Sequence, residues 1–106
     1  MAIIKFSEPI EWEGETHTQI DTDQLRRLKG KDKLAIMRRL RQRKIHDVLQ
    51  PESDERYILA ALDLATGIPE DALAELPITE FSEVILEAQG SLLGSASPSP
   101  KVPSAS

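Results

Sequence analysis

The first residues alternate apolar and polar positions in a way that is typical of half-buried strands. Residues 3–6 (Ile-Ile-Lys-Phe) are rich in β-branched and aromatic side chains and predict a short strand. Pro9 has no amide hydrogen to donate, so an edge position or a bend is expected there. Ile10 and Trp12 then alternate with glutamates, which continues the half-buried pattern.

A second strand is expected to return directly after the first. Glu13 and Gly14 predict a two-residue turn, because Gly14 tolerates a positive φ, and residues 16–20 follow as the returning strand. His17 and Ile20 cannot face the same side of a regular strand. The sequence therefore predicts a β-hairpin that contains a bulge or has a longer turn.

Beyond the hairpin the apolar spacing changes from that of strands to that of helices. Leu25 and Leu28 are expected to point inward from a single helical turn that Gly30 ends. Asp32 is then a candidate N-cap for a helix that runs to about Leu49.

Three apolar residues, Leu34, Met37 and Leu40, predict the buried stripe of this helix. Arg41 and Lys44 fall in the same sector at 100° per residue. Either their aliphatic stems lie along the core and carry the charges to solvent, or the core-facing part ends near Leu40 and the rest protrudes.

The next helix is predicted to lie at the centre of the protein. Pro51 stops the preceding helix, and Ser53 is the expected N-cap of a helix over residues 54–66. This segment is apolar on most sides, which is typical of a buried helix. Gly67 is expected to end it in the left-handed conformation, and a short helix over residues 70–76 follows.

The last helix carries two apolar stripes. It is expected to run from Glu80 to about Leu93 with Thr79 as its cap. Its core stripe is predicted to comprise Phe81, Val84, Ile85, Ala88 and Leu92. A second ridge consists of Leu86, Gly90 and Leu93 at spacing i, i+4, i+7. Glycine inside a helix costs about 1 kcal/mol relative to alanine, so Gly90 indicates either close packing against a partner or fraying of the helix end.

Together these elements predict an α+β fold that is mostly α: a short N-terminal β-hairpin, then three main helices and one short helix. With 106 residues, of which 40% are hydrophobic, the chain has room for one modest core. Residues 1–94 are expected to form a single domain. Residues 95–106 are rich in Ser and Pro and are expected to be a disordered tail.

Few residues in this chain are suited to catalysis or to metal binding. The chain has no cysteine, and His17 and His46 have no partner at the spacing of metal ligands. Serines lack a nearby base. We therefore expect no enzymatic activity, no catalytic residues, no metal and no cofactor. No apolar run approaches the roughly 18–20 residues of a membrane span, and the N-terminus lacks the basic start of a secretory signal, so a soluble intracellular protein without a membrane partner is expected.

The net charge of −5 conceals a strong asymmetry along the chain. Residues 22–50 carry ten Lys and Arg against three acids, whereas residues 51–94 carry one Arg against ten acids. The asymmetry indicates either ion pairing within the protein or two surfaces of opposite sign.

The basic residues are densest within residues 38–44. They could neutralise phosphates, which makes a small nucleic-acid-binding regulator an alternative function. However, these side chains point in nearly all directions around the helix, and no aromatic residue for base stacking lies among them. Nucleic acid is therefore the less favoured partner, and Arg39 and Arg43 are instead candidate contacts for an acidic protein partner.

The second ridge is the strongest candidate for a protein-binding surface. A helix that already buries one stripe has little reason to carry another unless that stripe also contacts something. Leu86, Gly90 and Leu93 are therefore predicted partner contacts, together with Ile36 on the first long helix.

The order of these motifs resembles that of the small tail assembly chaperones of tailed bacteriophages. The likeness begins with IIKFSEPIEWEGETHTQID and continues through DTDQLRRLKGKDKL. It ends with YILAALDLATGIPEDALAELPITEFSEVILEAQGSLLG, so it covers residues 3–94. None of these motifs is catalytic, and the specificity of the resemblance lies in their order and spacing.

The resemblance implies a non-enzymatic chaperone in the cytoplasm of a host bacterium. Members of this family are thought to coat the tape measure protein, a long helical chain, until tail tube protein polymerises around it, and to be absent from the mature virion. Many such genes also yield a longer product by ribosomal frameshifting, which would be a further partner. A structural subunit of the virion is the remaining alternative.

Overall fold

The protein begins with an antiparallel hairpin. The computed structural model describes residues 3–93, in which β1 (Ile3–Trp12) pairs with β2 (Glu15–Asp21). Glu13 (φ 51°) and Gly14 (φ 85°) both have positive φ, as the two central residues of a type I′ turn require. The predicted hairpin and its two-residue turn are confirmed, although the first strand is longer than the predicted residues 3–6.

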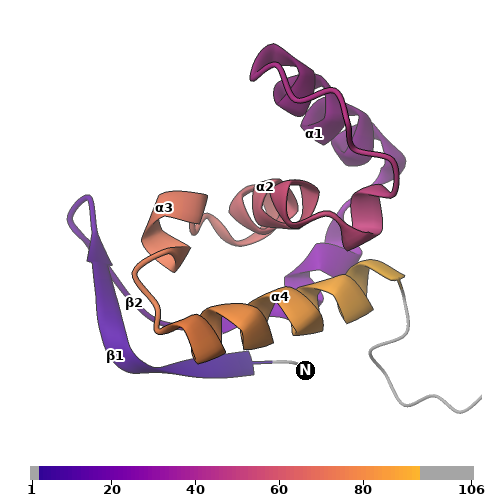
Figure 1. Cartoon of the computed structure of the whole chain (residues 1–106). Helices are drawn as coiled ribbons and strands as arrows, with labels where there is room; N and C mark the ends of the chain where they lie inside the picture. The colour runs from indigo at the N-terminus through magenta and orange to yellow at the C-terminus, as the bar shows by residue number, and fades with distance from the viewer. Residues whose placement is uncertain (1–2, 94–106) are drawn as a thin grey trace, which may run out of the picture.

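The predicted irregularity lies in β1 and ties the hairpin to the last helix. The pairing register shifts between Lys5 and Ile10, around Pro9, and Figure 1 shows β1 sharply bent. The Ser7 amide donates a hydrogen bond to the Glu80 carboxylate at 3.1 Å. The bulge therefore frees a backbone donor that holds the start of the last helix.

The first long helix differs from its prediction at both ends. A 3-10 segment, η1 (Thr22–Arg27), precedes α1 (Gly30–Gln42), so the helix starts before Asp32 and ends well before Leu49. Asp32 lies inside the first turn, where its carboxylate accepts a hydrogen bond from the Lys29 amide at 2.7 Å. The predicted N-cap is therefore wrong, although Asp32 does satisfy a backbone donor near this terminus.

A C-terminal capping motif ends α1 early. The Ile45 amide donates to the Leu40 carbonyl and the Lys44 amide donates to the Arg41 carbonyl, both at 2.9 Å. Lys44 has a left-handed φ of 63°, and this combination is a Schellman motif. The chain turns back there and packs Ile45 against the core. Of the two alternatives for the helix end, the core-facing part does end near Leu40, but the helix itself stops two residues later.

The buried face of α1 is also rotated from the predicted stripe. Ile36 and Leu40 are buried and Met37 is partly buried, whereas Leu34 is 63% exposed. At 100° per residue, Leu34 lies about 120° around the helix from Leu40. Because α2 packs on the side of Leu40, Leu34 faces solvent.

The central helix is α2 (Glu55–Thr66), as predicted. Six consecutive residues, 57–62, are buried, and α2 contacts η1, α1 and α4. A short 3-10 segment, η2 (Pro51–Ser53), precedes it, and Asp54 rather than the predicted Ser53 is its N-cap. Gly67 ends the helix with φ 79°, which confirms its predicted left-handed conformation.

Two further helices complete the fold. The short α3 (Glu70–Leu73) is briefer than the predicted residues 70–76, and α4 starts at Ile78 rather than after Thr79 and runs to Leu93. Val84, Ile85 and Ala88 of α4 are buried. Phe81 and Leu92 are partly buried against the same core.

The arrangement confirms the predicted α+β class with helix dominating. In Figure 1, α4 and the hairpin lie on one side of α2, and α1 lies on the other. The predicted tail, residues 95–106, lies outside the described residues.

The cap of α2 generates a test that involves pH. Asp54 accepts a hydrogen bond from the Arg56 amide, and the Arg56 guanidinium donates to the same carboxylate. These bonds hold the pKa of Asp54 below its ordinary value of 3.8. The carboxylate therefore stabilises the fold above the pKa of the unfolded chain, and this contribution is lost as pH falls through the lower folded pKa.

We expect Asp54→Ala to lower the free energy of unfolding by about 1 kcal/mol at pH 7, because the N-cap is lost. Asp54→Asn keeps a capping side chain and should cost less, but it should reduce the loss of stability seen below about pH 4. Urea unfolding followed by circular dichroism at several pH values measures both effects. Equal stabilities for the two variants at pH 7 would contradict the capping role.

Candidate partner-binding surface

The second ridge lies on the side of α4 that faces away from the core. Leu86 is 67% exposed, Leu93 is 57% exposed, and Gly90 between them is half-buried. Ile78, at the start of α4, is exposed as well and lies within about 80° of both leucines around the helix axis. Exposed apolar side chains thus recur along the whole length of α4.

The charges beside this ridge are all negative. Glu83 and Glu87 are exposed on α4, and no Lys or Arg occurs between Ile78 and Leu93. Glu80 lies nearer the hairpin, where hydrogen bonding to the side chain of Ser7 and then to its backbone amide lowers the pKa of the Glu80 carboxyl group. The apolar ridge is therefore bordered by carboxyl groups and by no basic side chain of α4.

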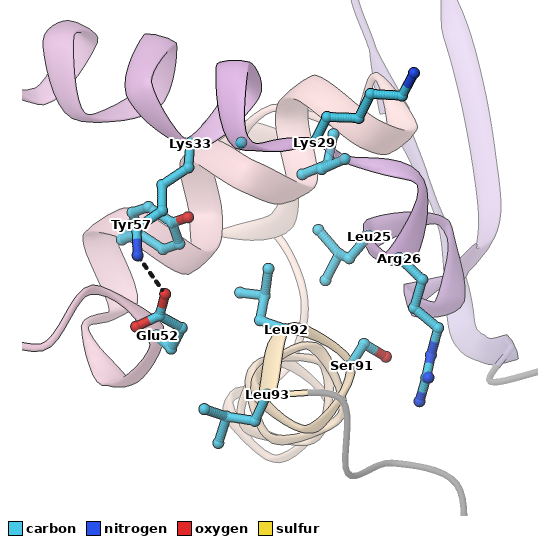
Figure 2. A pocket seen from close by; sticks show the side chains of 11 residues that line it. Leu25, Arg26, Lys29, Lys33, Glu52, Tyr57, Ser91, Leu92 and Leu93 are labelled. Carbon is cyan, nitrogen blue, oxygen red and sulfur yellow. Dashed lines mark hydrogen bonds and ion pairs between the residues drawn. The ribbon is translucent and has the colours of Figure 1, made fainter.

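A groove opens at the C-terminal end of α4. Its volume is about 400 Å³. Figure 2 shows Leu25 and Leu92 extending into the space between η1, α1 and α4, with Leu93 at the edge. The complete lining comprises Leu25, Arg26, Leu28, Lys29, Gly30, Lys33, Glu52, Tyr57, Ser91, Leu92 and Leu93. Because Leu93 belongs to both, the second ridge leads directly into this groove.

Ion pairs stand on opposite sides of the groove. Lys33 Nζ lies 2.9 Å from Glu52 Oε2, as Figure 2 shows, and Arg26 Nε lies 3.4 Å from Asp23 Oδ1. The Lys33 hydrogen bond lowers the pKa of the Glu52 carboxyl group, and Glu52 in turn raises the pKa of the Lys33 amine. The groove therefore has an apolar floor and a charged rim.

Ile36 does not belong to this surface. Its side chain is 2% exposed and is part of the core between α1 and α2. The predicted contact between Ile36 and a partner is thus wrong for the folded protein. The mistake has the same origin as the misplaced stripe of α1, since the face that was expected to be outward is the one that packs on α2.

Arg39 and Arg43 are occupied within the protein. Arg39 Nη2 lies 3.0 Å from Asp63 Oδ2 on α2, and Arg43 Nη1 lies 3.8 Å from Glu70 Oε1 on α3. With the pair between Lys33 and Glu52, these contacts favour internal pairing as the explanation of the charge asymmetry. Both arginine side chains are half-exposed, so a partner could still contact them. Their role as partner contacts stays a prediction.

Residues 3–93 were also compared with the requirements of a metal site and of a membrane-spanning helix. Among residues 3–93, no three His, Cys, Asp or Glu side chains gather closely enough to hold a metal ion. In the same part of the chain, no helix has the length and apolar character that crossing a bilayer requires. His17 contacts Glu15, with Nε2 3.7 Å from the carboxylate.

Comparisons of the chain with protein-family models, with curated proteins and with solved structures find no match. The resemblance to phage tail chaperones therefore stays a prediction carried by the order of motifs in the sequence. The groove, by contrast, was missed at the sequence level. Its signal was partly present in the inward-pointing Leu25 and Leu28, but its position depends on α1 beginning beside the end of α4.

The different burial of Ile36 and Leu34 on α1 can be tested by mutation. We expect Ile36→Ala to lower the free energy of unfolding by about 2–5 kcal/mol, because it opens a cavity against α2. Leu34→Ala, on the same helix but exposed, is the matched control and should change it by less than about 0.5 kcal/mol. Chemical denaturation measures both, and similar losses for the two variants would refute the observed rotation of α1.

Proposed function

We propose that this protein is a non-enzymatic assembly chaperone that binds an amphipathic helical segment of a phage tape measure protein and keeps it soluble. The observation that carries the proposal is the second ridge, on which Leu86 and Leu93 stay exposed although the opposite side of α4 is buried. The resemblance of residues 3–94 to tail assembly chaperones supplies the identity of the client.

The size of the exposed ridge fits reversible binding. Complete burial of a fully exposed leucine side chain contributes about 1.5–3 kcal/mol. Leu86 and Leu93 are 67% and 57% exposed, so together they would contribute about 2–4 kcal/mol. Association also costs several kcal/mol of translational and rotational freedom. Each copy would thus bind weakly, and a long client would be covered by many copies that tail tube protein can displace.

The proposal extends to location and further partners. The protein would act in the cytoplasm of the bacterial host, where the client is synthesised, and would leave before the virion is complete. Tail tube protein, or a longer frameshifted form of this chain, would then be the partner that links the coated client to assembly. Helix-in-groove binding is the mode that an apolar ridge leading into a groove supports.

Replacement of the ridge leucines tests the binding role. Co-expression with the tape measure gene of the same phage should raise the soluble fraction of the client. The double variant Leu86→Glu, Leu93→Glu should abolish this effect, because it places charges where apolar contacts are proposed. Sedimentation of cell lysates measures the soluble client, and circular dichroism should show unchanged helix content.

The matched control is Leu34→Glu with Leu49→Glu, which alters two exposed leucines outside α4. This variant should solubilise the client as well as the original chain does. Full activity of the α4 variant, or equal loss in both variants, would refute the assignment of the second ridge as the binding surface.

The composition of the virion tests the role in assembly. A chaperone that is released should be missing from purified particles, whereas tail tube and tape measure peptides should be abundant. Quantitative mass spectrometry of purified virions and of infected-cell lysates makes the comparison. A stoichiometric amount of this chain in particles would instead identify a structural subunit.

A further inference from the structure

The binding surface is electrically polar along the axis of α4. Glu83 and Glu87 border the first part of the second ridge, and α4 has no basic residue of its own. The opposite end, at the groove, is lined by three basic residues, Arg26, Lys29 and Lys33, and by one acid, Glu52. Lys33 is paired with Glu52 and Arg26 with Asp23, so a ligand that lies along the ridge meets only carboxylates at one end and an excess of basic groups over acids in the lining of the other.

The apolar contacts set the length of such a ligand. Leu86 and Leu93 are seven residues apart, which is about 10 Å along a helix. The groove beyond Leu93 extends the path onto Leu92 and Leu25. A helix of about three to four turns would cover the path, and one apolar stripe on that helix would suffice.

We propose that the surface binds an amphipathic helix with an acidic N-terminal half and a basic C-terminal half, oriented antiparallel to α4. This inference rests on the proposed function and specifies the client segment. The acidic half would lie at the groove, where it would compete with Asp23 and Glu52 for Arg26 and Lys33, and the basic half would lie over Glu83 and Glu87. Helices favour acids near the N-terminus and bases near the C-terminus, so the charge order required by the surface also stabilises the bound helix.

A second copy of this chain fits the surface less well. The charged residues of α4 in another copy are all acidic, so that helix offers no basic half to contact Glu83 and Glu87. Each copy also carries a net charge of −5, which opposes self-association. A separate helix of mixed charge satisfies both ends of the surface.

The test uses two fluorescent peptides of 18 residues and identical composition, each with one leucine stripe. The forward peptide has its acids in the N-terminal half and its bases in the C-terminal half, and the reverse peptide has the opposite order. Fluorescence anisotropy at low salt should show the forward peptide binding the full chain about five-fold more tightly or better, as expected from a few exposed ion pairs. The advantage should shrink at high salt.

The reverse peptide is also a weaker helix by itself, so variants of the protein must separate the two effects. Glu83→Lys with Glu87→Lys should remove most of the preference for the forward peptide. Glu11→Lys with Glu13→Lys, at the hairpin tip, makes the same change in net charge at exposed positions and should preserve it. A preference that survives the α4 variant would overturn the proposed orientation.

The remaining outcomes distinguish this inference from the proposed function. Equal binding of both peptides would overturn the orientation and leave the chaperone role intact. Binding of neither peptide, with the client still solubilised through Leu86 and Leu93, would overturn the charged helix alone. Light scattering that shows a dimer, converted to a monomer by the α4 leucine variant, would assign the surface to a second copy and overturn the inference.

Discussion

The complete burial of the middle of α2, residues 57–62, is the constraint on which the rest of the fold depends. Residues 57–62 have no face left for solvent, so the neighbouring elements must cover the helix. Ala60 and Ala61 contribute small side chains that allow those neighbours to approach closely. One apolar face of α1 and one of α4 are used for this purpose. A second apolar face on either helix is therefore not needed to cover α2. Of the two helices, α4 carries such a face, the second ridge.

The same constraint creates the groove. Ile36 and Leu40 attach α1 to α2, and exposed ion pairs to Glu52, Asp63 and Glu70 border this contact. Such pairs contribute only about 0.2–1 kcal/mol each, so apolar packing fixes the position of α1 and the charges refine it. This position puts the basic start of α1 beside the last turn of α4. The groove is thus a consequence of how two helices share the surface of a third.

Local signals made some of these features predictable from the sequence. Three features have a pattern that lies within a few residues of the chain. They are the two apolar stripes of α4, the left-handed Gly67 and the turn at Glu13 and Gly14. The end of α1 left none, because Lys44 adopts the left-handed conformation in which a glycine would have been recognised. The burial of Ile36 in place of Leu34 depends on which side α2 approaches. The groove depends on contacts between residues more than fifty positions apart, which periodicity does not encode.

A weak and directional surface is well matched to the proposed task. A chaperone that bound its client through an extensive interface would be released slowly, since tight complexes have low dissociation rates. In the proposed complex, two exposed leucines and a few solvated charges would instead form a weak contact whose occupancy depends on the concentration of the chaperone. Because the surface is acidic at one end and basic at the other, it would also align successive copies in one direction along a helical client. Tube subunits polymerising from one end would then meet the same edge of each bound copy, so that a single geometry of displacement would serve along the whole length of the client.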